Sequence, residues 1–176
     1  MFYPIYLYGE DILRKKAQNA DLDDPMLLNL IEDMFSTMRM ANGSGLAAPQ
    51  IGISKKIIVI EEKILDENTF KLVLINPVVL DISTSLTKFE EGCLSIPGIN
   101  EDVIRPSEIE IQWFNENKIY NKQIFTGLQA RIIQHELDHL EGKLFIDYLH
   151  PDVRMKHFMK LEDIKNKKIT VNYPVK

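Results

Sequence analysis

Two histidines one helical turn apart, with a glutamate beside the first, are the residues of this sequence with the clearest chemical potential. The pentapeptide HELDH at 135–139 places both imidazoles on one face of a helix, so both can reach a single metal ion. Glu136 lies beside them, where its carboxylate can take a proton from a water molecule activated by that ion. The alternative is an amphipathic helix that carries two surface histidines and no metal.

The residues around this motif favour a helix whose histidines face inward. Leu128 and Ile132 fall on the same helical stripe as the two histidines. Histidines on a buried face need polar partners, and a metal ion supplies one for each. Thr126 and Gln129 fit a capping box at the start of this helix, and Gly142 fits a left-handed cap at its end.

A catalytic metal site needs a third protein ligand, for which the sequence offers few candidates. The extended motif HExxHxxGxxH would require a histidine where the sequence has Phe145, which cannot bind a metal. Glu162 has a suitable separation for a glutamate ligand, but no supporting motif surrounds it. Cys93, the only cysteine, remains, although a lone cysteine is usually a small buried apolar residue. Two histidines, one cysteine and a water molecule would make an open site of the catalytic kind.

A glycine-bracketed segment, GSGLAAPQ at 43–50, follows a predicted helix. It is compatible with a plain connector from helix to strand, and it lacks the Lys-Ser/Thr pair of a phosphate-binding loop. Gln50 is its residue with chemical potential, because the side-chain amide can donate a hydrogen bond to a developing oxyanion.

Three segments in this order, GSGLAAPQ (43–50), EGCLS (91–95) and QHELDH (134–139), resemble the signature motifs of peptide deformylases of the bacterial type 1 form. The resemblance extends from about Tyr3 to Tyr148. It implies an enzyme that removes the formyl group from the N-terminal formyl-methionine of newly made polypeptides and releases formate.

The resemblance also implies one divalent metal ion per chain, Fe²⁺ in the cell, for which Zn²⁺, Ni²⁺ or Co²⁺ can substitute. Its ligands would be Cys93, His135 and His139, with Glu136 as general acid and base, Gln50 and the backbone N–H of Leu94 as oxyanion donors, and Gly45 in backbone contact with the substrate. Ser44 stands where relatives often have valine or isoleucine. For the methionine side chain we expect an apolar pocket lined by Leu128, Ile132 and Phe89.

Two other classes of protein carry similar motifs. A metallopeptidase uses HExxH chemistry on peptide bonds, but Cys93 as ligand and the missing third-ligand motif argue against it. A non-enzymatic module with a structural metal would need four protein ligands, and only His150 or His157 could complete the set.

Length and composition predict one soluble domain, residues 1–176, of which 151–176 form a C-terminal helix and tail. Hydrophobic residues make up 45% of the chain and charged residues 27%. The single cysteine excludes an internal disulfide and fits a reducing cytosol, and the N-terminus does not resemble a secretory signal. We therefore expect a cytoplasmic protein that does not bind membranes.

Charge is distributed unevenly along the chain. The whole chain carries −5, which argues against general or sequence-specific nucleic-acid binding. Residues 151–176 contain seven Lys or Arg and three Asp or Glu, a net charge of +4, so the first 150 residues carry −9. This segment is either a solvated terminal helix or a basic surface that contacts the ribosome, where formylated chains emerge.

Hydrophobic periodicity predicts the elements that position these residues. The expected elements are a helix from Asp24-Pro25 to just before Asn42, strands over Lys56–Glu61, Lys71–Leu80 and Glu108–Phe114, a partner strand ending near Ile124, the HELDH helix, and a final helical stretch from Pro151 to about Lys165. Strands and helices do not alternate, so the predicted fold class is α+β, with largely antiparallel sheets packed around the HELDH helix and a C-terminal helix.

Glu91 and Arg105 are expected either to form a buried ion pair near the thiol or to remain two solvated charges.

Overall fold

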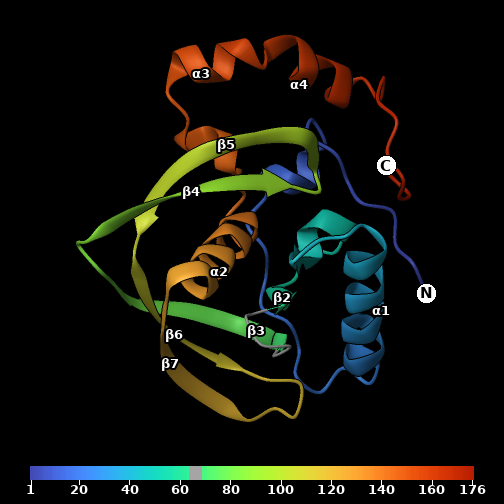
Figure 1. Ribbon diagram of the computed structural model, residues 1–176. Helices are drawn as coiled ribbons and strands as arrows, with labels where there is room; N and C mark the ends of the chain where they lie inside the picture. The colour runs from blue at the N-terminus through green and yellow to red at the C-terminus, as the bar shows by residue number, and fades with distance from the viewer. Residues whose placement is uncertain (64–68) are drawn as a thin grey trace.

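The computed structural model describes residues 1–63 and 69–176 and has the predicted α+β architecture (Figure 1). The helices are α1 (Leu27–Met40), α2 (Gly127–Leu140), α3 (Pro151–Lys156) and α4 (Phe158–Lys165), with 3-10 turns η1 (Asp11–Arg14), η2 (Ala48–Ile51) and η3 (Phe145–Tyr148). The strands are β1 (Gly45–Ala47), β2 (Ile57–Lys63), β3 (Thr69–Ile82), β4 (Leu86–Cys93), β5 (Ile96–Pro106), β6 (Glu108–Phe114) and β7 (Tyr120–Thr126).

Two antiparallel sheets enclose the helix that carries HELDH. One sheet has five strands in the order β1-β2-β3-β6-β7, and the other is the β4-β5 hairpin. Figure 1 shows α2 between the hairpin and the larger sheet, and α1 beside the larger sheet. Apolar side chains of α1 pack with Val59 and Ile75, whereas those of α2 pack with Ile58, Leu74 and Ile111. The larger sheet is therefore covered on both faces, which explains the continuous apolar run at the start of β2.

Most element boundaries were close to those predicted. Strand β6 has the predicted bounds, β3 extends two residues beyond its predicted bounds at each end, and β2 begins one residue later and ends two residues later than predicted. Helix α1 begins at Leu27 rather than at Pro25, because the Asp24 carboxylate accepts the Met26 N–H and closes a turn ahead of the helix. The predicted helical stretch from Pro151 to about Lys165 is present, but His157 divides it into α3 and α4.

The β4-β5 hairpin was not among the elements predicted from the sequence. Its strands carry many polar residues and present a largely exposed outer face, so their apolar alternation is weak. Within the hairpin, Gly92 makes room for the Asn100 side chain of the opposite strand, because a Cβ there would lie 2.5 Å from Asn100 Oδ1.

Caps were predicted at both ends of α2, and the structure has the one at its C-terminal end. Gly142 has a φ of 73°, and the Lys143 N–H donates to the Asp138 carbonyl, which confirms the predicted left-handed cap. Thr126 is the N-cap residue, but its side chain makes no capping hydrogen bond, so the predicted capping box is wrong. The next residue, Gly127, has a φ of 57°, a left-handed conformation that favours glycine at the first position of the helix.

No helix in the described ranges 1–63 and 69–176 has the length and apolar character needed to cross a membrane.

Candidate active site

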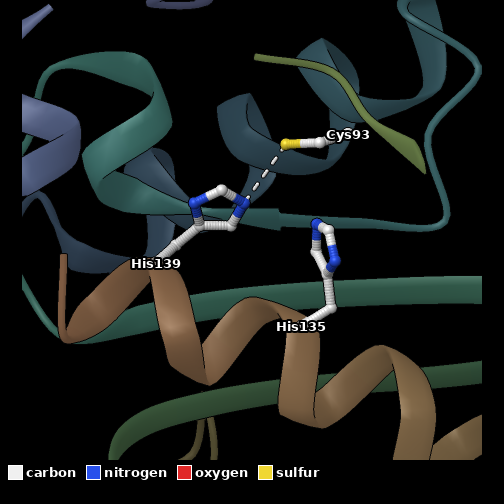
Figure 2. A group of neighbouring side chains, drawn as sticks. All are labelled: Cys93, His135 and His139. Atoms are coloured by element: carbon white, nitrogen blue, oxygen red, sulfur yellow. Dashed lines mark hydrogen bonds between the residues drawn. The ribbon is translucent and has the colours of Figure 1, made fainter. Parts of the chain in front are cut away.

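The end of β4 and one face of α2 bring three potential metal ligands together (Figure 2). Cys93 Sγ lies 3.3 Å from His139 Nε2, and His135 points toward the same thiol from one turn earlier on α2. One ligand atom from each of Cys93, His135 and His139 lies within 4.8 Å of the other two. The predicted ligand set is therefore assembled from residues more than forty positions apart.

The donor set fits a divalent transition metal. One thiolate and two imidazoles suit Zn²⁺ and its first-row neighbours, and ligand atoms on one tetrahedral ion lie about 3.3–3.8 Å apart. The buried ring of His139 supports this fit, because its Nε2 faces the thiol at 3.3 Å. With three protein ligands the site would leave a position for water or substrate.

The other candidate ligands lie elsewhere. The side chain of His150 is 72% exposed, and His157 Nε2 lies 2.6 Å from Glu101 on β5. Glu162 is on α4 and belongs to no metal-ligating cluster found among the described residues. Phe145, at the position of the third histidine in the extended motif, packs its ring against His135 at 6.2 Å between centroids.

A buried ion-pair network holds His135 in place. Glu91 Oε2 accepts a hydrogen bond from His135 Nδ1 at 2.9 Å. Arg105 donates two hydrogen bonds to the same carboxylate at 2.6 and 2.9 Å, and Arg131 donates one at 2.7 Å. The expected pairing of Glu91 with Arg105 is thus confirmed in its buried form. Such a carboxylate fixes the orientation of the imidazole and leaves Nε2 free for a metal.

Two members of this network were not recognised in the sequence. Asp138 accepts a hydrogen bond from Arg105 at 2.6 Å, and Arg131 also donates to the Val103 carbonyl at 2.9 Å. Arg131 lies one turn before His135 on the buried side of α2, where an arginine requires an acidic partner. The place of Arg131 on the apolar side of the helix could have indicated a buried ion pair, but the sequence does not show which carboxylate is its partner.

Burial and neighbouring charges shift the pKa values of the site in opposite directions. Burial raises the pKa of Glu91, but hydrogen bonds from Arg105 and His135 outweigh it and hold this pKa well below its usual range. Burial lowers the pKa of His135, whereas hydrogen bonds with Cys93 and Glu91 raise it to well above the usual value. The pKa of His139 is held well below its usual value by burial and by the charge of His135, so His139 is neutral, the form that binds a metal.

Glu136 is buried against the GSGLAAPQ segment. It is 4% exposed, and a Cβ at Gly45 would lie 2.5 Å from its Oε1, so only glycine permits this approach. Burial raises the pKa of Glu136 to about 7. Its Oε2 has no hydrogen-bond partner among the described residues, so this oxygen is free to accept a proton from water or substrate.

Gln50 reaches the turn that follows Cys93. Its Oε1 accepts the Ala47 N–H at 2.8 Å, which fixes the orientation of the amide. Its Nε2 then lies 3.3 Å from Ser95 Oγ and 3.6 Å from Cys93 Sγ. The donor expected from sequence is therefore at the site, next to the backbone of Leu94.

Gln50, Cys93, His135 and Glu136 line a cleft of about 1050 Å³. Its walls come from all three motifs and include Gly45, Leu94, Leu128 and Ile132. Phe89 was expected among them but is not one of the described lining residues, because the Arg131 guanidinium covers its ring at 5.1 Å. A part of the wall that sequence did not predict is the C-terminal tail, residues 169–173.

Comparison with known proteins gives one consistent result. The model of the polypeptide deformylase family matches residues 2–155. A peptide deformylase from Prosthecochloris aestuarii is 42% identical over 177 residues, covering 99% of this chain and 95% of the relative. A plant peptide deformylase structure has a TM-score of 0.88 at 36% identity, covering 94% of this chain and 90% of the other. The peptide deformylase from Synechococcus elongatus, solved in complex with actinonin, has a TM-score of 0.81 at 40% identity, covering 98% and 92%.

Proposed function

Because the chain belongs to the peptide deformylase family, whose members remove the formyl group from the N-terminal formyl-methionine of new polypeptides, we propose a specific division of labour among its residues. Cys93, His135 and His139 bind one divalent metal ion. The observation that carries this assignment is the convergence of one sulfur and two nitrogen atoms within 4.8 Å at the wall of the cleft.

The remaining residues act on the substrate and the attacking water. When bound, the metal ion would act as a Lewis acid and lower the pKa of its bound water toward neutrality. Glu136 takes the proton of the attacking water, for which its pKa of about 7 is suited, and then delivers a proton to the leaving amine. The amide of Gln50 and the N–H of Leu94 donate to the oxyanion that develops on the formyl group. Gly45 keeps backbone close to Glu136 and offers hydrogen-bonding groups to the peptide.

Substrate discrimination tests this proposal. The purified protein should release formate from formyl-Met peptides and leave matched acetyl-Met peptides and internal peptide bonds intact. Hydrolysis of internal bonds without deformylation would instead indicate a metallopeptidase.

Fe²⁺ is the metal we propose for the cell. The Cys/His/His set accepts Fe²⁺, Zn²⁺, Co²⁺ and Ni²⁺, and the affinity order of these ions does not decide occupancy. Metal analysis of anaerobically purified protein, paired with its deformylation rate, tests the choice. Iron should be stoichiometric and should give the fastest enzyme, and a faster zinc form would contradict the proposal.

We further propose that the enzyme acts in the cytoplasm as one catalytic domain, residues 1–176, and that residues 151–176 contact the ribosome. The segment carries a net charge of +4, and three apolar residues beside its lysines, Met155, Phe158 and Met159, are 69%, 52% and 71% exposed. Figure 1 shows α3 and α4 along the outer edge of the molecule. A surface that is basic and apolar can bind ribosomal RNA or an acidic ribosomal protein.

Charge removal tests the ribosome contact. Replacing Lys156, Lys165 and Lys168 by glutamine should reduce co-sedimentation with ribosomes at low salt, and wild-type binding should weaken steeply as salt rises. Lys167 is left intact because it pairs with Glu10 at 3.0 Å. The control replaces three exposed lysines outside this segment, Lys15, Lys63 and Lys143, which form no ion pair among the described residues. Equal co-sedimentation of both triple variants would indicate a solvated segment without this role.

A further inference from the structure

The turn between β4 and β5 carries two parts of the proposed site. Leu94 and Ser95 form a two-residue turn, because Cys93 pairs with Ile96 across the hairpin. The thiol of Cys93 and the N–H of Leu94 are therefore adjacent, at the point where the hairpin ladder ends. Peptide groups in such a turn are not satisfied by the ladder and take partners from other segments.

Three other segments of the chain hold this turn. The Tyr8 N–H donates to the Ser95 carbonyl at 2.8 Å, and Gln50 Nε2 donates to Ser95 Oγ at 3.3 Å. The third contact comes from the C-terminal tail, where the Tyr173 hydroxyl donates to the Leu94 carbonyl at 2.8 Å. Of the three, only the Tyr173 contact is made to Leu94 itself.

The tail that supplies Tyr173 is anchored to the N-terminal segment. The Ile5 N–H donates to the Pro174 carbonyl at 2.8 Å, and the Lys176 N–H donates to the Ile5 carbonyl at 2.9 Å. Val175 pairs with Ile5 in a parallel bridge and packs against the apolar cluster that includes Leu7. The red tail in Figure 1 turns back from α4 toward the start of the chain. Tyr173 is thus presented from a segment with fixed partners.

We infer that Tyr173 is a positioning residue for deformylation, which holds the Leu94 backbone so that its N–H faces the developing oxyanion. The inference rests on the proposed role of Leu94. The carbonyl and the N–H of Leu94 are joined through two backbone dihedrals, so fixing one restricts the other. Because the oxyanion exists only in the transition state, a loosened donor lowers kcat and leaves substrate binding nearly unchanged.

The variant Tyr173→Phe removes the hydroxyl and keeps the ring in the cleft wall. We expect kcat on a formyl-Met peptide to fall about 3- to 10-fold, the range for loss of one hydrogen bond, with KM within about twofold and metal content unchanged. The matched control is Tyr120→Phe, whose hydroxyl donates to Gln112 Oε1 at 2.9 Å on the β6-β7 hairpin. The control should keep both kinetic constants.

Amide hydrogen exchange supplies a readout that does not depend on catalysis. The amides of Leu94 and Ser95 should exchange faster in Tyr173→Phe than in wild type, and at the wild-type rate in Tyr120→Phe. A kcat within twofold of wild type, a loss confined to KM, or unchanged exchange in the turn would each overturn the inference. Absence of deformylation by the wild-type protein would refute the proposed function instead, and the exchange result would still report on the turn.

Discussion

Cys93 is the only cysteine of the chain, and its Sγ lies within 4.8 Å of a ring nitrogen of both His135 and His139 on α2. Both histidines of the cluster already serve as ligands in this assignment, and His150 and His157 lie outside the cluster. Metal binding should therefore depend on this one side chain more than on any surface residue.

Replacing Cys93 by alanine should abolish both metal binding and deformylation, because two histidines alone make an incomplete site. Metal content by elemental analysis and formate release should fall together. The variant His157→Ala is the control and should keep both, since its imidazole pairs with Glu101 away from the cluster. Stoichiometric metal in the Cys93→Ala protein would contradict the assignment.

Glu136 separates proton transfer from metal binding. Its carboxylate is buried beside Gly45 and lies outside the Cys/His/His ligand group. The variant Glu136→Gln should keep its metal and lose about 10²- to 10⁴-fold in kcat, since the amide cannot accept the proton of water. A metal-free or nearly fully active Gln variant would show that this residue has another role.

At the scale of elements, the central feature is the junction between α2 and the β4-β5 hairpin. Glu91 on β4, Arg105 on β5 and Asp138 on α2 form one buried chain of ion pairs. The network ties the histidine helix to the strand that ends in Cys93. Buried charges of this kind are costly to leave unpaired.

The variant Arg105→Ala should lower the free energy of unfolding by about 3–5 kcal/mol, because it leaves Glu91 and Asp138 without their shared partner. Urea denaturation measures this change. The control is Lys88→Ala, which removes the exposed Lys88–Asp102 pair of the same hairpin and should cost less than about 1 kcal/mol. Similar losses in the two variants would mean that the buried network adds no more than a surface pair.

At the scale of the whole molecule, the proposed site joins distant parts of the chain. The GSGLAAPQ segment, the β4-β5 turn, α2 and the C-terminal tail all reach the same cleft. A metal ion that binds only this assembled arrangement stabilises the folded state as a whole.

Removing the metal should lower the melting temperature. A ligand present at 100 times its Kd stabilises the folded state by about 2.7 kcal/mol. For a domain of this size, that corresponds to roughly 5–10 °C. Thermal unfolding with and without a chelator measures the shift, and Cys93→Ala should show little or none. A shift of equal size in that variant would indicate that the chelator acts elsewhere.

The sequence by itself determined the features that depend on neighbouring residues. The spacing of His135 and His139, the left-handed cap at Gly142 and the alternation of β6 all follow from local backbone geometry, and the structure has them as predicted. Elimination left Cys93 as the candidate third ligand, the motif resemblance implied the same role, and the cluster contains it.

Only the tertiary structure decided the contacts between segments. The sequence left open whether Glu91 and Arg105 were buried together, and it did not indicate that Arg131 completes their network. It also gave no sign that the tail packs on Ile5 and brings Tyr173 to Leu94. Helical and strand periods record which side of an element is apolar, but not which distant element that side meets. That choice is made by burial, charge pairing and hydrogen bonding across the assembled chain.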